Sequence, residues 1–247
     1  MLVVGATGAT GTHLVRQLLD RGHRVRAVVR CSDKVPSDLK AHAHLSLIEG
    51  SLLDFSDKEL QTHVAGCAAV ASCLGHIMSA KGIWGHPRLL CTDATRRLCT
   101  AIEASEPDNP VRFVLMNTVG NANRDQGEEK THSYGHSIAL SLLRNLVPPH
   151  HDNEQAAQHL VASVGKSNTH VEWVVVRPDA LVDDAAVTPY TAHASPLSNP
   201  LSNPGRTSRI NVAHFMADLM SCGLPGSVFV RWKSQMPVLY NDNAHPK

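Results

Sequence analysis

The sequence lacks a strong charge bias, a long apolar segment and an abundance of aromatic residues. Its 23 Lys and Arg offset 22 Asp and Glu, and the net charge of +1 provides no basic surface for nucleic acid. No apolar run approaches the ~20 residues that a membrane span requires, and no apolar secretory leader precedes the first predicted strand. We therefore expect a cytoplasmic protein with neither nucleic-acid nor membrane partners.

Metal-binding and disulfide patterns are also absent from the sequence. Among the 16 histidines, His132 and His136 have i, i+4 spacing and His150 adjoins His151, but no Cys or third His has the spacing of a zinc site. We therefore predict no metal site. The cysteines are scattered through predicted strands and helices, which favours reduced, mostly buried thiols; they are Cys31, Cys67, Cys73, Cys91, Cys99 and Cys222.

The first eleven residues predict a strand, a tight glycine turn and the beginning of a helix. An apolar run at 2–4 precedes the turn, and apolar residues between 14 and 19 have helical spacing. A dinucleotide diphosphate requires this arrangement, because N–H groups at a helix N-terminus carry partial positive charge and missing Cβ atoms let phosphates approach. A plain structural turn is the alternative, but the order of elements favours a nucleotide-binding loop. The predicted loop residues are Gly5, Thr7, Gly8, Ala9, Thr10 and Gly11, the threonines as hydroxyl donors.

The spacing Gly-x-x-Gly-x-x-Gly, here Gly5-Ala6-Thr7-Gly8-Ala9-Thr10-Gly11, resembles the atypical branch of the short-chain dehydrogenase/reductase superfamily. Within that branch the chain looks most like the NmrA-like proteins and the flavin/biliverdin reductase B group. The resemblance covers nearly the whole chain and implies an α/β fold, a Rossmann-type doubly wound parallel sheet that binds NAD(P)(H). We expect a single domain over 1–247, in which 179–247 contributes a small substrate-side cap.

The residues after the second predicted strand, at 23–30, favour NADP(H) over NAD(H). An NAD site usually has an acid here for the ribose 2′-hydroxyl, whereas arginine suits a 2′-phosphate. Arg30 ends this strand, Ser32 and Lys34 follow, and Asp33 is the first acid. A guanidinium binds a phosphate dianion well, and an unpaired carboxylate would repel it. The alternative is that Arg30 is an ordinary solvated strand end.

The resemblance also implies where the adenine lies. After a third strand at 45–48, the family commonly has an acid that faces the adenine amino group. Ser51 replaces this acid, which leaves Leu52 to pack against the ring. A helix follows at 57–65, with Ser56 as its predicted N-cap.

Two later strands lead to further predicted cofactor contacts. The apolar run 67–74 ends at Leu74 and Gly75, and ligands of parallel sheets bind beyond the carboxyl ends of the strands. After the strand at 171–176 comes an Arg-Pro pair, a recurrent mark of NmrA-like and extended reductases. Pro178 stiffens the chain beside the cofactor, and Arg177 is interpreted as a buried structural partner.

The Tyr-x-x-x-Lys motif that supplies the proton in better-known members of the superfamily is absent. Tyr134 is followed four residues later by Ile138. Related reductases carry Ser or Thr near the nicotinamide at the tip of the strand at 111–118, and Thr118 occupies that place. Its hydroxyl can donate to an oxyanion or to the nicotinamide amide, although a structural role is the alternative.

The segment beginning Pro148-Pro149-His150-His151 opens a predicted helix with two interpretations. Helix capping accounts for its acids, with Asp152 as N-cap and Glu154 in the first turn. The resemblance implies instead that Glu154 or a neighbouring histidine, His151, faces the pocket as a catalytic residue.

The C-terminal part is less regular in its pattern. The loop at 77–87 and the segment 188–207 are each either a wall or flap of a substrate pocket or an ordinary loop, and 188–207 shows no helix or strand period. Asn211 is the predicted N-cap of a helix at 212–220, and a last strand is predicted at 228–230.

These observations predict an NADPH-dependent reductase that transfers a hydride to a small conjugated or carbonyl substrate. The proton would come from solvent, Glu154 or His151. A non-catalytic NADP(H)-sensing regulator of the NmrA-like type, with a protein partner, is the second hypothesis. An isomerase or lyase that uses its bound nucleotide transiently or structurally is the third.

Overall fold

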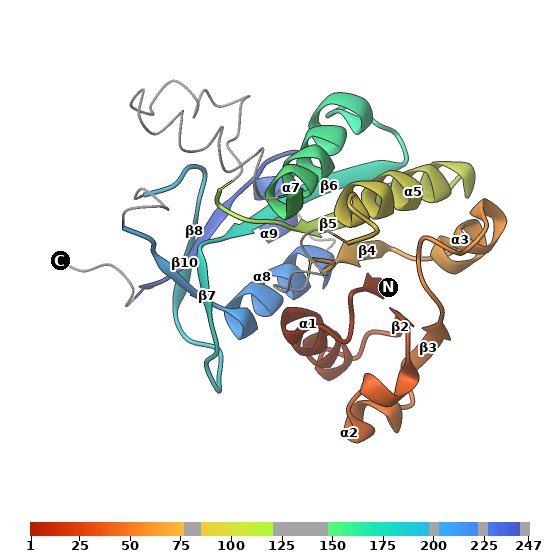
Figure 1. Cartoon of the computed structure of the whole chain (residues 1–247), viewed down its shortest axis with the longest axis horizontal. Coiled ribbons are helices and arrows are strands. Elements are labelled where there is room, and N and C mark those ends of the chain that lie inside the picture. The colour runs from red at the N-terminus through yellow and green to blue at the C-terminus, as the bar shows by residue number, and fades with distance from the viewer. Residues whose placement is uncertain (77–84, 121–147, 198–202, 222–226, 243–247) are drawn as a thin grey trace.

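The computed structural model describes residues 1–76, 85–120, 148–197, 203–221 and 227–242. In these residues an eight-stranded sheet lies between two layers of helices (Figure 1). The strand order is β3-β2-β1-β4-β5-β6-β10-β8, and β8 alone among these strands runs antiparallel to its neighbour. The strands are β1 (Leu2–Val4), β2 (Val25–Val29), β3 (Leu45–Glu49), β4 (Ala69–Ser72), β5 (Val111–Met116), β6 (Val171–Pro178), β8 (Tyr190–His193) and β10 (Val238–Asn241).

The sheet is doubly wound about β1, as the sequence predicts. From β1 the chain builds outward through β2 and β3, then returns to the other side of β1 at β4 and continues through β5 and β6. The order reverses between β1 and β4, and the carboxyl ends of these strands are where such sheets bind their ligands. A second, two-stranded parallel sheet joins β7 (Ala180–Val182) to β9 (Arg206–Ser208).

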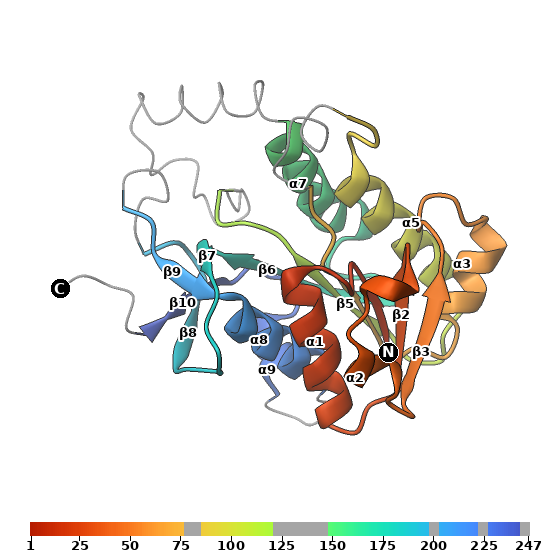
Figure 2. The same cartoon turned by 60° about the horizontal axis from the view of Figure 1, so that its bottom comes forward.

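Helices cover both faces of the sheet, as Figure 2 shows. One core packs α1 (Ala9–Asp20), α8 (Arg209–Ser221) and α9 (Val228–Trp232) against the sheet, with α2 (Ser37–Lys40) at its edge. The other packs α3 (Asp57–Val64), α5 (Leu90–Ala104) and α7 (Pro148–His159), which continues into the π-type turn η4 (Leu160–Val164). Successive side chains of β1 point to opposite faces of the sheet, so β1 contributes to both cores. Val3 lies in the first core, and Leu2 and Val4 lie in the second.

The predicted strand at 228–230 is wrong. These residues belong to the short helix α9, in which Phe229 and Trp232 are buried three positions apart while Val230 is 63% exposed. The i, i+3 spacing of the two aromatic rings fits a helix face, whereas three apolar residues in a row do not distinguish helix from strand. The last strand of the sheet is β10, which lies beside β6.

Two further predictions about the C-terminal part need correction. Ser208 is the cap at the beginning of α8, since its Oγ accepts the N–H of Asn211 at 3.3 Å. The Asn211 side chain instead donates to Asn241 Oδ1 at 2.8 Å and ties α8 to β10. The segment 188–207 also contains a strand, β8, where none was predicted. The division of the chain into a domain and a cap from 179 onward stays a prediction.

Several local predictions are confirmed. Ser56 caps α3, and a reciprocal bond from its backbone N–H to Glu59 Oε2 completes a capping box. The described cysteines are free thiols, namely Cys31, Cys67, Cys73, Cys91 and Cys99.

Within the described ranges, every helix is too short or too polar to cross a membrane. His132, Tyr134, His136, Cys222 and much of the loop at 77–87 lie outside the described residues.

Candidate cofactor-binding site

The glycine turn joins β1 to α1 with a geometry that requires glycine. Gly5 has φ +74°, in the left-handed region, and its carbonyl accepts the N–H of Gly8 at 3.0 Å. A Cβ on Gly5 would lie 2.5 Å from the carbonyl oxygen of Cys73, directly after β4. A Cβ on Gly11 would lie 2.9 Å from the carbonyl carbon of Gly5. The turn is therefore packed between the end of β4 and the first turn of α1.

The N-terminus of α1 has the chemistry of an anion site. Gly8 occupies the N-cap position, where among the described residues no side chain bonds the first helical N–H groups, and the first turn contains no acid. Thr12, in the first turn of α1, stabilises the glycine turn, because its hydroxyl donates a hydrogen bond to the Ala6 carbonyl at 3.1 Å. N–H groups that have no intrahelical partner and the positive end of the helix dipole suit a diphosphate. The residues present therefore fit a dinucleotide.

A cavity of about 380 Å³ extends from this turn across the carboxyl ends of β1, β2 and β4. It contains most of the residues predicted for the cofactor, namely Gly5, Thr7, Gly8, Arg30, Ser51, Leu52, Leu74 and Gly75. Three predicted loop residues lie outside its lining. Ala9 is exposed on the first turn of α1, while Thr10 and Gly11 are buried beneath the turn. The roles of these three residues toward the cofactor stay predictions.

Sequence reasoning missed several residues of the lining. Strand-end residues account for most of them, and the rule that ligands bind beyond the carboxyl ends of strands could have found these. Cys73 is not among the missed residues, because the same rule places the end of the apolar run 67–74 beside the nucleotide, and it lines the cavity. Burial raises the pKa of its thiol to about 12, so the thiol stays protonated. The lining residues without a predicted role are Val4, Val28, Val29, Cys31, Gly50, Leu53 and Leu90. Pro87 also lines the cavity and ends the loop 77–87, for which a pocket wall is one of the two interpretations.

Two cations lie at the β2 end of the cavity. Arg30 follows β2, and Lys34 ends the short 3₁₀ helix η1 (Ser32–Lys34); both line the cavity. Asp33, between them, has a 91% exposed side chain that approaches Lys40 Nζ at 3.5 Å. Asp33 is absent from the lining, so the charge at this end of the cavity is positive.

Thr118 and Pro178 lie near the carboxyl ends of β5 and β6, outside the lining of this cavity. Thr118 is half-buried, and its Oγ1 accepts the N–H of Gly120 at 3.4 Å. Pro178 is buried, and its carbonyl accepts the N–H of Val119 at 3.1 Å. Asn117 donates from its side chain to the Asn153 carbonyl at 2.8 Å and so joins β5 to α7.

The two predicted catalytic residues on α7 differ in environment. His151 is exposed, and its Nε2 accepts the side-chain amide of Gln155 at 2.7 Å. Glu154 is half-buried.

Asp152 does not cap α7, contrary to the sequence prediction. It lies inside α7, fully buried, and its carboxylate accepts the N–H groups of Cys91 and Thr92, each at 2.8 Å. It therefore caps the neighbouring helix α5. His76 Nε2 lies 2.7 Å from the same carboxylate, and Thr92 Oγ1 donates to the Asp152 carbonyl at 2.9 Å.

His76, Cys91 and Asp152 come together from three separate segments, with potential ligand atoms within 4.8 Å of one another. Motif spacing does not reveal such a group. Hydrogen bonds account for the arrangement, because the carboxylate already accepts two N–H groups and contacts the imidazole. Burial and the nearby Asp152 raise the pKa of the Cys91 thiol, which disfavours the thiolate that a metal would need.

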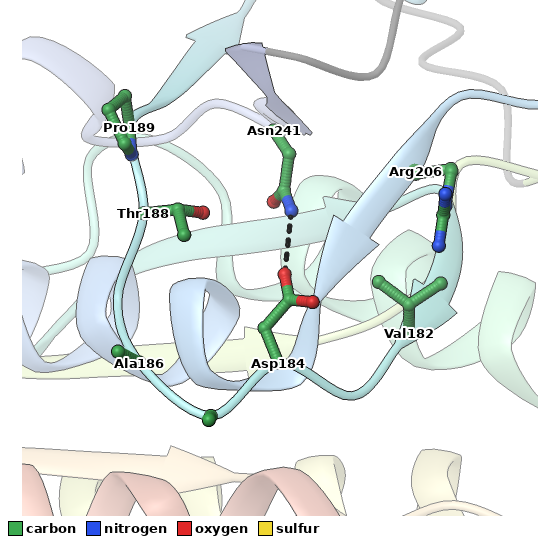
Figure 3. Close-up of a pocket in the computed structure, with 8 residues that line it drawn as sticks. Val182, Asp184, Ala186, Thr188, Pro189, Arg206 and Asn241 are labelled. Atoms are coloured by element: carbon green, nitrogen blue, oxygen red, sulfur yellow. Dashed lines mark hydrogen bonds between the residues drawn. The ribbon is translucent and has the colours of Figure 1, made fainter.

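A second cavity, of about 390 Å³, lies in the C-terminal part of the chain (Figure 3). It shares no lining residue with the first. Asn241 donates to Asp184 Oδ2 across it at 3.2 Å, and Arg206 also lines it. Arg177 on β6 is fully buried and donates from Nε to the Met236 carbonyl at 2.7 Å, which supports its interpretation as a structural partner.

A tight glycine turn that leads into the open N-terminus of a helix, beside the reversal point of a doubly wound sheet, defines a dinucleotide-binding protein of the Rossmann type. A family model described as NAD(P)H-binding matches residues 5–222, and the chain belongs to this family.

Solved structures share the fold at low sequence identity. An anaerobillin reductase from Escherichia coli O157:H7 has a TM-score of 0.67 and 17% identity, covering 100% of this chain and 98% of that protein. A putative NADH-flavin reductase from Streptococcus pneumoniae has a TM-score of 0.64 and 16% identity, covering 98% of both chains. A short-chain dehydrogenase/reductase from Veillonella parvula, solved with NADP, has a TM-score of 0.65 and 14% identity, covering 99% and 95%.

Curated relatives match over shorter stretches. A 3-beta-hydroxysteroid dehydrogenase from Mycolicibacterium neoaurum is 42% identical over 66 residues, which are 27% of this chain and 16% of the relative. Cinnamoyl-CoA reductase 2 from Arabidopsis thaliana is 30% identical over 129 residues, 50% of this chain and 37% of the relative. The chain thus spans well under half the length of these two relatives.

Proposed function

We propose that the chain is an NADPH-dependent reductase that transfers a hydride to a small conjugated or carbonyl substrate without a Tyr-x-x-x-Lys dyad. One observation carries the proposal: the cavity joins an open helix N-terminus, suited to a diphosphate, to a strand end with two cations, suited to a further phosphate. Relatives named as reductases of flavin, anaerobillin and cinnamoyl-CoA support the class of reaction.

The preference for NADP(H) rests on Arg30 and Lys34. A guanidinium binds a phosphate dianion through two parallel hydrogen bonds, and an ammonium adds a point charge. The one nearby carboxylate, on Asp33, lies beside Lys40 and outside the lining, so it does not oppose an anion. An NAD-type site would instead place a carboxylate at the ribose.

Arg30→Gln is expected to raise the Kd for NADPH about 10- to 100-fold, because it removes a charge-assisted bond to the 2′-phosphate. The Kd for NADH, which lacks this phosphate, stays within about twofold of the unsubstituted value. Isothermal calorimetry with both nucleotides measures the change. Arg16→Gln is the matched control, since Arg16 is exposed, binds Asp38 and lies outside the cavity. Equal losses for NADPH and NADH would contradict the assignment.

The remaining contacts are assigned to residues within the cavity and to two residues beyond its lining. Ser51 and Leu52 are assigned to the adenine, and Leu74 and Gly75 to the ribose and diphosphate side. Thr118 and Pro178 are assigned to the nicotinamide side, beyond the ends of β5 and β6. NADPH supplies the hydride when it is bound, so the chain must align the substrate with it and exclude water.

Three side chains are assigned to the reaction itself. The Thr118 hydroxyl donates a hydrogen bond to the substrate oxygen as negative charge develops there. The proton that completes the reduction comes from solvent, Glu154 or His151. Glu154 is half-buried, whereas His151 is exposed and bonded to Gln155.

Thr118→Ala is expected to lower kcat about 100-fold with little change in the Kd for NADPH, because a donor to a developing oxyanion acts mainly in the transition state. Thr118→Ser keeps the hydroxyl and restores most of the rate. Glu154→Gln and His151→Gln identify the proton source: a comparable loss in one of them assigns it, and two active variants assign solvent. An active Thr118→Ala variant would refute the role of the hydroxyl.

NADPH oxidation with a panel of quinones, flavins and carbonyl compounds tests the whole proposal. We expect turnover with at least one class. Tight NADP binding without turnover would favour the sensing regulator, and product formation without net NADPH consumption would favour the isomerase or lyase. A chain that binds neither NADP nor NADPH would contradict all three.

A further inference from the structure

Arg97 holds the loop that follows β3 from outside the cavity. This loop, 50–55, contributes Gly50, Ser51, Leu52 and Leu53 to the lining, whereas Arg97 on α5 is not part of it. The guanidinium donates to the carbonyls of Leu52 at 3.1 Å and Leu53 at 2.7 Å. It also donates to the carbonyl of Phe55 and, at 3.1 Å, to Asp57 Oδ1.

These bonds determine the shape of the loop. Three carbonyl groups within four residues point toward one planar cation, an arrangement that the fixed fork of an arginine can satisfy and that a lysine can satisfy only in part. The peptide planes between them are thereby fixed, because each trans peptide is rigid. The loop closes on itself through the Asp54 N–H, which donates to the Ser51 carbonyl at 3.0 Å. The Phe55 ring lies against Gly50, where a Cβ would be 2.5 Å from it.

The bonds from Arg97 to the loop 50–55 are expected to contribute more to adenine binding because residue 51 is a serine. The resemblance places an acid at this position, where it would accept the adenine amino group, and serine provides no such charge. Adenine affinity must then depend on the shape of the loop and on Leu52, a buried side chain. A loop already held in its binding conformation loses less conformational entropy when the ligand binds.

We infer that Arg97 is a positioning residue for the cofactor: by binding the backbone of 52–55 it preorganises the loop that receives the adenine. The inference rests on the proposed dinucleotide site. It assigns to Arg97 an effect on the adenylate half of the cofactor, independent of the 2′-phosphate and of the nicotinamide.

Arg97→Met tests this inference, with Arg96→Met as the matched control. Arg96 is the next residue on the same helix, but its side chain is 57% exposed and pairs only with Asp93 on α5 among the described residues. Calorimetric Kd values for NADPH, NADH and 2′,5′-ADP are measured well below the melting temperature of each variant. We expect Arg97→Met to weaken all three ligands by the same factor, about tenfold, and Arg96→Met to weaken none.

The pattern separates Arg97 from other roles. Equal losses for NADPH and NADH distinguish it from Arg30, whose removal weakens the two ligands that carry the 2′-phosphate, NADPH and 2′,5′-ADP, and leaves NADH unchanged. An equal loss for 2′,5′-ADP places the effect in the adenylate half. Unchanged affinities, or a smaller loss for 2′,5′-ADP than for NADPH, would overturn the inference.

Arg97→Lys provides a second variant if the methionine protein does not fold. It keeps the charge but not the planar fork, so we expect the same ligand pattern with a smaller loss; unchanged affinities overturn the inference here too. If the unsubstituted chain binds none of the three ligands, the proposed function fails. If it binds them and Arg97 variants bind equally well, only the inference fails.

Discussion

Gly5→Ala is expected to abolish measurable NADPH binding and to lower the free energy of unfolding by about 2–5 kcal/mol. Two costs combine. An L-residue at φ +74° adopts the left-handed region, and its Cβ would lie 2.5 Å from the Cys73 carbonyl oxygen and 2.8 Å from the Leu74 nitrogen. Relief of this overlap moves the turn away from β4. The turn and the N-terminus of α1 then no longer present their N–H groups to one diphosphate.

Gly22→Ala is the matched control for this substitution. Gly22 has nearly the same backbone angle, φ +79°, but a Cβ there would meet no atom within 4 Å. It therefore carries the conformational cost, about 1–2 kcal/mol, without the steric one. Calorimetry should give the same Kd for NADPH in Gly22→Ala and in the unsubstituted chain, while urea unfolding shows a small loss. A Gly5→Ala variant that binds NADPH as well as Gly22→Ala would show that the packing of the turn on β4 is not required.

Local patterns explain how much of the fold was predictable from sequence. The glycine turn, the capping box of Ser56 and the buried parallel strands each depend on residues within a few positions of one another, and their spacing is visible in the sequence. The short run Val228-Phe229-Val230 shows where such patterns fail. Three apolar residues fit a strand or one helical turn equally. The segment forms a helix because this places both Phe229 and Trp232 in the core.

The parts of the candidate site that lie directly after a strand were predictable from the sequence. The parts that depend on contacts between distant segments were not. Arg30 and the residues after β1 and β4 lie at strand ends, which the order of elements identifies. Arg97 binds a loop more than forty positions earlier, and no periodicity or motif indicates that contact. Asp152 is the sharpest case. An acid near the beginning of a helix is usually its cap, yet this one caps a different helix, about sixty residues away in the sequence.

Asp152→Ala is expected to lower the free energy of unfolding by about 3–5 kcal/mol, because it leaves several buried donors without their acceptor. The Cys91 and Thr92 N–H groups begin α5 and are buried with the carboxylate, so water does not replace it. His76 loses the same partner. Asp152→Asn should cost less than alanine, since one amide oxygen can still accept one N–H group.

Asp183→Asn is the matched control for Asp152. Asp183 also forms a charged contact, with Arg209 at 2.8 Å, but its side chain is 78% exposed. Surface pairs contribute little, so we expect a change within about 0.5 kcal/mol. Urea unfolding of the variants should therefore rank alanine at 152 as least stable, asparagine at 152 next and asparagine at 183 close to the unsubstituted chain. Because α5, α7 and the end of β4 meet at this carboxylate, Asp152→Ala should also weaken NADPH binding through the displaced Gly75 and Leu90. A variant with unchanged stability would mean that α5 does not depend on Asp152 for its N-terminal cap.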